Sequence, residues 1–262
     1  MITYERRQSL LDVLRKQPGL RVPELARVLG VSEGTVRNDL NALEREGRLK
    51  RVHGGAVLND QNEFQNNSFV RRYKQNVAAK IAIAQEAALL INDGDSIFLD
   101  ASSTDYYLAL ELSKRRDLRI VTNGFEVARE LAENPTHNVI LIGGVVNNSS
   151  SSVTGLLSER IIEEMSIEKT FLACSGFSMD RGMTEILLAE AQIKRKVIGS
   201  SQALYALVDS SKFGKEDLTS FASPQKIHRL FTDDGISQEW LGRLNDAGVE
   251  VTICKEEGIP LK

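Results

Sequence analysis

The chain has little of the chemistry that typifies disulfide scaffolds or metal proteins. Among its 262 residues are only two cysteines, Cys174 and Cys254, and three histidines. Both cysteines lie in apolar, strand-like runs, and His and Cys show no metal-ligand spacing. We therefore expect two buried thiols, no metal site and no bound cofactor.

Long apolar runs are also missing. No such run reaches the roughly eighteen residues that a membrane helix needs, and the opening MITYERR lacks a signal-peptide core. We expect a cytoplasmic protein with no membrane partner. At 262 residues, with 42% hydrophobic and 26% charged residues, the chain has the composition of a globular protein with one small and one medium domain.

Charge is distributed unevenly along the chain. Residues 1–57 contain eleven Lys or Arg and seven Asp or Glu, a balance of +4, whereas the remainder balances to −7. A cationic head on an anionic body favours a polyanion as the partner of the head alone. A net charge of +4 on residues 1–57 gives one copy limited affinity for the phosphates of a polyanion. We therefore expect a dimer or tetramer, because each added copy brings further phosphate contacts.

Residues 21–56 predict two short helices, joined by a tight turn and followed by a basic hairpin. Leu25 and Leu29 repeat at helical spacing on the first helix. Gly30 permits the turn, and the Ser32 hydroxyl can accept a free backbone N–H at the start of the second helix. This arrangement is typical of a helix-turn-helix with a wing.

The second of these helices has two faces of different chemistry. Val36, Leu40 and Leu43 are spaced to share a buried face. The other face is polar and barely acidic, which suits the base edges of a DNA major groove. The candidate DNA contacts on this helix and the hairpin are Ser32, Gly34, Thr35, Arg37, Asn38, Asn41, Lys50, Arg51 and His53. The alternative is an ordinary helical hairpin with solvated charges, which the agreement of cap, turn, core spacing and basic hairpin disfavours.

From residue 77 onward the sequence alternates between helical and strand patterns. Short apolar runs bounded by polar turns predict a largely parallel sheet with helices on both faces. The expected strands are 96–100, 118–122, 138–142, 169–174, 203–208, 227–232 and 249–253. Residues 58–76 are polar, rich in Asn and Gln, and predict a linker. The expected organisation is therefore a DNA-binding domain at 1–57, a linker at 58–76 and a second domain at 77–262.

Polar residues follow the expected strands at their carboxyl ends, where open parallel sheets bind ligands. Ser102, Ser103 and Thr104 lie where a strand leads into a helix, and their hydroxyls and backbone N–H groups can hold a phosphate. Lys212 offers a cation, and Asp100 can accept hydrogen bonds from sugar hydroxyls. Further candidates at strand ends are Thr122, Asn123, Gly124, Gly143 and Gly144. Each residue alone has a structural explanation as a cap, turn or ion-pair partner, but their convergence favours a ligand site.

Two long stretches resemble the DeoR family of bacterial transcription regulators. The helix-turn-helix signature of that family is matched by Arg6-x3-Leu10-x3-Leu14, then seventeen residues, then Ser32-x2-Thr35-Val36-Arg37-Asn38-Asp39-Leu40. The wing that follows is similar to KRVHGGA at residues 50–56. The likeness continues through most of the remaining chain.

The resemblance implies a winged helix-turn-helix domain, followed by a Rossmann-like, mostly parallel α/β domain that resembles ribose-5-phosphate isomerase and binds phosphorylated sugars. The family elements Asp-x-Gly-[Ser/Thr]-Thr, Thr-Asn, Gly-Gly and Asp-x-Ser-Lys-Phe-Gly match residues 100–104, 122–123, 143–144 and 209–214. The next element adds Gly176 and Glu185 as effector-binding candidates. Ser102 stands where the family has glycine, and the arginine that often follows Gly-Gly is absent after Gly144.

We therefore expect a transcriptional repressor of a carbohydrate operon, with double-stranded operator DNA and a phosphorylated sugar as partners. The alternative is a sugar-phosphate isomerase with an added DNA-binding domain. Isomerisation needs a carboxylate base over the substrate carbon. Related isomerases carry an Asp-Gly-Ala-Asp-Glu type element, which residues 175–180 lack. The sequence also shows no histidine near a nucleophile motif, so we expect no enzyme activity.

Overall fold

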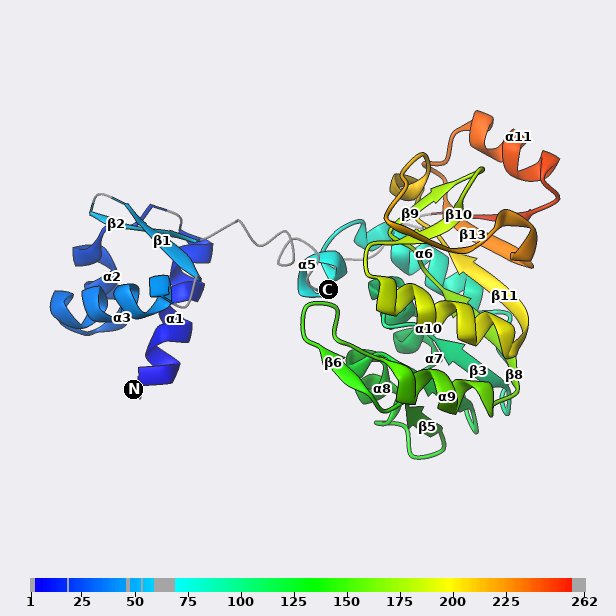
Figure 1. The fold of residues 1–262 in the computed structure, drawn as a ribbon, viewed down its shortest axis with the longest axis horizontal. Coiled ribbons are helices and arrows are strands. Elements are labelled where there is room, and N and C mark those ends of the chain that lie inside the picture. The colour runs from blue at the N-terminus through cyan, green and yellow to red at the C-terminus, as the bar shows by residue number, and fades with distance from the viewer. Residues whose placement is uncertain (1–2, 18, 46–47, 53, 59–68, 256–262) are drawn as a thin grey trace. The chain divides into compact units, whose positions relative to one another are not determined.

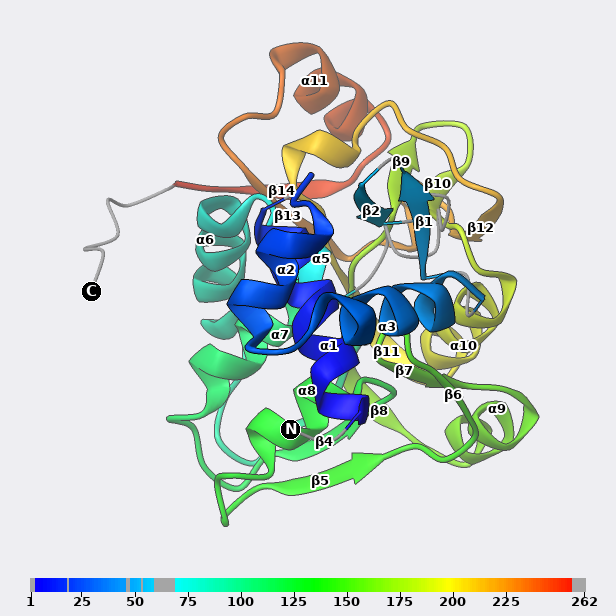
Figure 2. The same ribbon diagram turned by 90° about the vertical axis from the view of Figure 1, so that its left-hand side faces the viewer.

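The computed structural model describes residues 3–17, 19–45, 48–52, 54–58 and 69–255. The chain divides into two compact units, residues 1–66 (unit 1) and 67–262 (unit 2). Figures 1 and 2 show the elements of each. Over the described ranges, no helix combines the length and the apolar character needed to span a bilayer.

Unit 1 is a three-helix fold with a two-stranded hairpin. Its elements are α1 (Thr3–Lys16), α2 (Val22–Leu29), α3 (Glu33–Arg45), β1 (Leu49–Val52) and β2 (Gly55–Leu58). Gly30 ends α2 in the left-handed conformation, at a φ of 65°, which glycine adopts without steric cost. The Ser32 hydroxyl accepts the backbone N–H of Thr35 at 3.2 Å, so Ser32 caps α3 as the sequence predicted. β1 and β2 pair antiparallel.

Among the described residues of unit 1, the buried core is apolar except for Asp39, which two arginines contact. Leu10, Leu25 and Leu40 are fully buried, and Asp39 lies beside them on α3. An Asp39 carboxylate oxygen lies 2.6 Å from Arg6 Nε, and the other lies 3.1 Å from Arg7 Nε. Burial alone would raise the pKa of Asp39, but the two arginines outweigh it and hold the pKa below its ordinary value. This contact fixes α1 against α3.

Unit 2 is built on a seven-stranded sheet in which every neighbouring pair is parallel. The strand order is β14-β13-β11-β8-β3-β4-β5. The bounds are β3 (Ser96–Leu99), β4 (Arg119–Thr122), β5 (Asn138–Leu141), β8 (Ile167–Leu172), β11 (Ser201–Leu207), β13 (Arg229–Asp233) and β14 (Glu250–Cys254). Each lies at a predicted position, which confirms the expected parallel α/β fold. The chain runs outward from β3 and then returns to β8, so the order reverses between β3 and β8.

Helices cover both faces of this sheet. One buried cluster joins the sheet to α6, α7 and α8, and a second joins it to α9, α10 and α11. The bounds are α6 (Val77–Ala88), α7 (Ser103–Leu112), α8 (Phe125–Leu131), α9 (Leu156–Glu163), α10 (Leu188–Gly199) and α11 (Gln238–Asp246). Cys174 and Cys254 are free and buried in these clusters, as the sequence predicted.

Two smaller antiparallel sheets accompany the main one, and the sequence analysis did not anticipate either. They are β6 (Val145–Asn147) with β7 (Ser152–Thr154), and β9 (Gly176–Ser178) with β10 (Gly182–Glu185) and β12 (Thr219–Ala222). Two short 3-10 helices complete the unit, η1 (Ser210–Lys212) after β11 and η2 (Pro224–Lys226).

The predicted linker at 58–76 contains a helix, α5 (Phe69–Tyr73). Its Phe69 N–H donates to Ser149 O at 2.9 Å, between β6 and β7. The Phe69 ring meets the edge of Tyr106, and the Tyr73 ring stacks on Tyr107 with centroids 5.0 Å apart. Within the predicted linker, residues 69–73 thus form a helical turn that two aromatic side chains hold against α7. Residues 59–68 lie outside the described residues.

Candidate functional site

In unit 1, α3 presents a polar face to solvent, on which exposed arginines and glutamates balance. Arg37 and Asn38 are exposed, and the Arg37 side chain pairs with Glu33 at 2.9 Å while remaining 54% accessible. A Cβ added at Gly34 would meet only Ser32 Oγ, at 3.8 Å, so the start of the helix is open to close approach. The buried side of α3 carries Val36, Leu40 and Leu43, as their spacing predicted.

The hairpin is tied to α3 by hydrogen bonds. Arg51 donates from Nη1 to the Asn41 side-chain oxygen at 2.6 Å, and its backbone N–H donates to a Glu44 carboxylate oxygen at 2.7 Å. Lys50 is exposed. These hydrogen bonds hold the candidate DNA contacts of α3 and of the hairpin at fixed positions relative to one another, and Asn41 orients the Arg51 side chain. His53, another candidate, lies outside the described residues.

In unit 2, a buried lysine occupies the point where strand order reverses. Asp100 follows β3, Ala173 follows β8, and Lys194 reaches both from α10. Its ammonium nitrogen lies 2.9 Å from an Asp100 oxygen and donates to Ala173 O at 2.8 Å. Glu185 of β10 lies 2.5 Å away. Open parallel sheets bind ligands at this kind of switch point.

The three charged groups of this cluster are almost wholly buried. Lys194, Asp100 and Glu185 are 2%, 3% and 8% exposed. Burial would lower the pKa of Lys194, but the two carboxylates outweigh it and raise the pKa. Burial raises the pKa of Asp100 and of Glu185, and Lys194 opposes both shifts. The two buried carboxylates of the cluster are therefore stabilised by the positive charge of Lys194.

The predicted phosphate-binding turn follows β3 directly. Ser102 caps α7, accepting the Asp105 backbone N–H at 2.9 Å, and its hydroxyl donates to Asp105 Oδ2 at 2.5 Å. Ser103 and Thr104 are buried in the first turn of α7. The remaining Asp105 oxygen, Oδ1, has no partner among the described residues. Burial, with Asp100 nearby, raises the pKa of Asp105 well above its ordinary value.

The candidates after β4 pack against this turn. Asn123 accepts the Ala101 backbone N–H on its side-chain oxygen at 3.0 Å, and the Thr122 hydroxyl accepts the Gly124 N–H at 3.0 Å. A Cβ added at Gly124 would lie 2.8 Å from Ala101 Cα, so glycine is needed for this approach. The structure therefore brings the candidates after β3 and β4 together.

The β6–β7 hairpin reaches the same region from the edge of the sheet. Val153 donates its backbone N–H to Asn123 O at 2.8 Å. Ser152 donates from its hydroxyl to Glu190 Oε1 at 2.9 Å, and Ser150 lies 2.8 Å from Ser152. The hairpin therefore places the hydroxyls of Ser150 and Ser152 between the end of β4 and α10. No pattern in the sequence had indicated these two serines as site residues.

Two of the three other candidate glycines are closely packed. A Cβ at Gly144 would lie 2.4 Å from Thr154 O, and one at Gly176 would lie 2.5 Å from Lys215 O. Gly143 accepts the Ser158 hydroxyl on its carbonyl at 2.7 Å. Close backbone approach therefore explains Gly144 and Gly176, whereas a Cβ at Gly143 would meet nothing within 4 Å.

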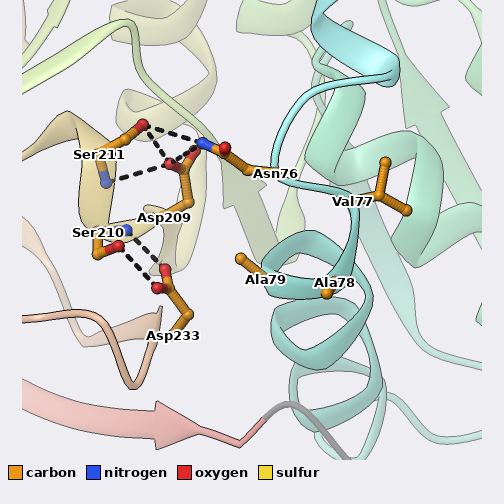
Figure 3. A pocket seen from close by; sticks show the side chains of 8 residues that line it. All are labelled: Asn76, Val77, Ala78, Ala79, Asp209, Ser210, Ser211 and Asp233. Carbon is orange, nitrogen blue, oxygen red and sulfur yellow. Dashed lines mark hydrogen bonds between the residues drawn. The ribbon is translucent and has the colours of Figure 1, made fainter. Parts of the chain in front are cut away.

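A pocket of about 250 Å³ opens beside the ends of β11 and β13 (Figure 3). Its lining residues are Asn76, Val77, Ala78, Ala79, Asp209, Ser210, Ser211 and Asp233. Asp209 accepts hydrogen bonds from the side chains of Asn76, at 2.9 Å, and Ser211, at 2.5 Å. Asp233 accepts the Ser210 hydroxyl at 2.7 Å. Lys212 follows Ser211 directly and does not line the pocket.

Lys80 is a buried cation near this pocket, and sequence reasoning did not single it out. Its ammonium donates to the carbonyls of Arg72 and Gln75 at the end of α5. Burial lowers its pKa to about 8, assisted by Lys212 and Arg72 and opposed by Asp209. Arg72 Nε is buried and has no partner within the described residues. The region therefore has an excess of positive charge around Asp209.

A winged helix-turn-helix with an exposed polar helix and a basic hairpin, in a chain whose second unit is an α/β fold with polar strand ends, defines a DNA-binding regulator with a sensor domain. Residues 6–62 match the DeoR-like helix-turn-helix domain, and residues 75–234 match the DeoR C terminal sensor domain. The chain belongs to the DeoR family.

Curated relatives match almost the whole chain. The HTH-type transcriptional regulator GolR of Listeria innocua is 38% identical over 97% of this chain and 100% of its own length. A putative aga operon transcriptional repressor of Escherichia coli O157:H7 is 31% identical over 97% and 95%. The lactose phosphotransferase system repressor of Streptococcus mutans is 35% identical over 87% and 91%. Ribose 5-phosphate isomerase A of Methanocaldococcus jannaschii aligns over 53% of this chain and 55% of its own, at 18% identity and a TM-score of 0.40.

Proposed function

We propose that this chain represses a carbohydrate-metabolism operon and that a phosphorylated sugar controls its affinity for operator DNA. The observation that carries the proposal is the solvent-exposed polar face of α3, in a chain whose relatives along nearly their full length are named as regulators. Two of those names specify sugar systems, the aga operon and the lactose phosphotransferase system. A cytoplasmic location agrees with this role.

For DNA binding, α3 enters the major groove and the hairpin contacts the flanking backbone. Arg37 exchanges its exposed pair with Glu33 for a base edge or phosphate. Exposed ion pairs contribute little, so the exchange costs little. Lys50 and Arg51 neutralise phosphates beside the groove. Two or four copies supply the repeated contacts that tight binding needs.

For sensing, the phosphate of the effector binds at the start of α7, where Ser103 and Thr104 offer hydroxyls and N–H groups. Ser102, whose hydroxyl is engaged with Asp105, offers its backbone N–H. Lys212 adds a cation, and Lys80 contributes positive potential. The sugar hydroxyls donate to carboxylates at the strand ends, Asp209 among them. The proposed chemistry is binding without turnover, as in relatives that are named as transcriptional regulators.

The coupling from effector to DNA passes through α5. Asn76, three residues after α5, donates to Asp209 at 2.9 Å, and Lys80 holds the carbonyls at the end of α5. An effector that engages Asp209 or Lys212 changes these contacts and biases the position of α5. The response then follows from different DNA affinities in the two states.

The first test is a thermal-shift screen of the full chain against phosphorylated and unphosphorylated sugars. A specific effector raises the melting temperature according to its occupancy. We expect one phosphorylated sugar to do so and to change binding of the chain to DNA from its own promoter region. If no sugar phosphate alters DNA binding, the proposed control by sugars is wrong.

A further inference from the structure

The longest uncharged stretch of the chain lies at one edge of unit 2. Residues 134–158 contain no Asp, Glu, Lys or Arg, although charged residues make up 26% of the chain. This stretch includes β5, the β6–β7 hairpin and the start of α9. Depletion of charge is a mark of the buried centre of protein interfaces.

The same region exposes a group of aliphatic side chains, here called the edge patch. Its members are Ile140 and Leu141 of β5, Val145 and Val146 of β6, and Leu156, Leu157 and Ile161 of α9. The exposed fraction reaches 69% at Val145 and 66% at Leu157. These elements lie together at the lower end of unit 2 in both views (Figures 1 and 2).

Close contacts join the three elements into one surface. Ser158 of α9 donates to the carbonyl of Gly143, two residues after β5, at 2.7 Å. A Cβ at Gly155, just before α9, would lie 3.5 Å from a methyl group of Val145. The edge patch is therefore continuous from the end of β5 through β6 to the first turn of α9.

Among the strands that the structure describes, β5 is also an edge strand and pairs with β4 alone. Soluble proteins protect such edges with charge, proline or a bulge. The sequence of β5, NVIL, has no charge or proline, and its pairing with β4 is regular. Ile140 and Leu141 are neighbours in a strand and point to opposite faces, yet both are exposed. A partner at this edge would cover both faces of β5 at once.

We propose that the edge patch is the surface on which a second copy of this chain binds. The seven side chains at these exposures present on the order of 600 Å² of apolar area, close to the roughly 800 Å² per partner of a standard interface. A twofold pairing makes the same patch meet itself, and its seven members bring aliphatic side chains to the contact. The assignment rests on the proposed function in one respect, because winged helix-turn-helix proteins read paired half-sites as dimers.

The experiment measures the mass of the full chain in solution, without DNA, by light scattering after gel filtration. One variant carries Leu156→Asp and Leu157→Asp, and a second carries Val145→Asp. The matched control is Leu89→Asp, at a leucine that is 68% exposed outside the patch. We expect an oligomer for the natural chain and the control, and half that mass for both patch variants, with unchanged circular dichroism.

A natural chain that stays at 29.1 kDa across the micromolar range would overturn the assignment. So would patch variants that keep the natural mass, because the copies would then meet elsewhere. Operator binding is measured separately by fluorescence anisotropy. Loss of mass in the patch variants with no operator binding by the natural chain would refute the proposed function and leave the edge patch as the self-association surface.

Discussion

The ammonium group of Lys194 lies 2.9 Å from a carboxylate oxygen of Asp100, and both side chains are buried. The contact joins α10 to the end of β3, where the order of the sheet reverses. Glu185 shares the same ammonium, so one cation holds two carboxylates at the candidate effector site. Removing that cation would leave both carboxylates without their counter-charge in a buried place.

The first prediction concerns the stability of unit 2. Replacing Lys194 with Met should lower the free energy of unfolding by about 3–5 kcal/mol, the usual loss when one partner of a buried ion pair is removed. Urea unfolding measures the change. Lys196→Met is the matched control on the same helix, because Lys196 pairs with Glu163 at the surface and its loss should cost much less. Equal losses in the two variants would contradict the buried network.

A second prediction concerns the DNA-binding face. Arg37→Ala should weaken operator binding by about 1–3 kcal/mol if the guanidinium contacts a base edge. Arg129→Ala, at an exposed arginine of unit 2 that pairs with Glu126, is the control and should bind as the natural chain does. Anisotropy titrations at a fixed salt concentration compare them. An Arg37 variant with full affinity would remove this side chain from the interface.

A third prediction tests coupling through α5. Asn76→Ala removes the hydrogen bonds to Asp209 and Ser211. Effector and operator should each still bind alone, but the effector should change operator affinity less than in the natural chain, where such coupling is typically about 1–3 kcal/mol. The measurement is operator affinity with and without saturating effector. An unchanged ratio would show that the signal does not pass through this contact.

The pH dependence of effector binding supplies a fourth prediction. The pKa of Lys80 lies at about 8 in the free protein, mainly because of burial, with Lys212 and Arg72 lowering it further and Asp209 raising it. A bound phosphate would raise that pKa, so binding takes up a proton above pH 8. Affinity should therefore fall as pH rises through 8, by up to about tenfold per unit. Calorimetry should show the fall in the natural chain and a weaker one in Lys80→Gln; identical profiles would exclude Lys80.

Much of this molecule follows from local sequence patterns. The strands near 96–100 and 203–208 appear where apolar runs end in polar turns, and Ser32 caps α3 as its position indicates. Lys194 could not be found this way. It stands two residues from the partly exposed Lys196 on the same helix, and the packing of α10 against β10, β11 and β12 separates the buried lysine from the solvated one.

The short elements β6, β7 and α5 could not be predicted from the sequence for a related reason. β6 and β7 are three residues each, too short for a strand period, and are held by Asn123 and Gly124 across the chain. α5 has five residues and is held by rings of α7. The site residues that such elements position, Ser152 and Lys80 among them, depend on contacts between distant segments. Sequence periodicity carries no signal of these contacts.

The central claim is that sugar phosphate sensing in unit 2 controls DNA binding by unit 1. It is tested most directly by titrating operator DNA with the natural chain and with Lys212→Ala, each with and without the phosphorylated sugar found by thermal shift. The account predicts equal operator affinity for both proteins without the sugar, and a change on adding it in the natural chain alone. An equal response in Lys212→Ala, or no response in either protein, would contradict it.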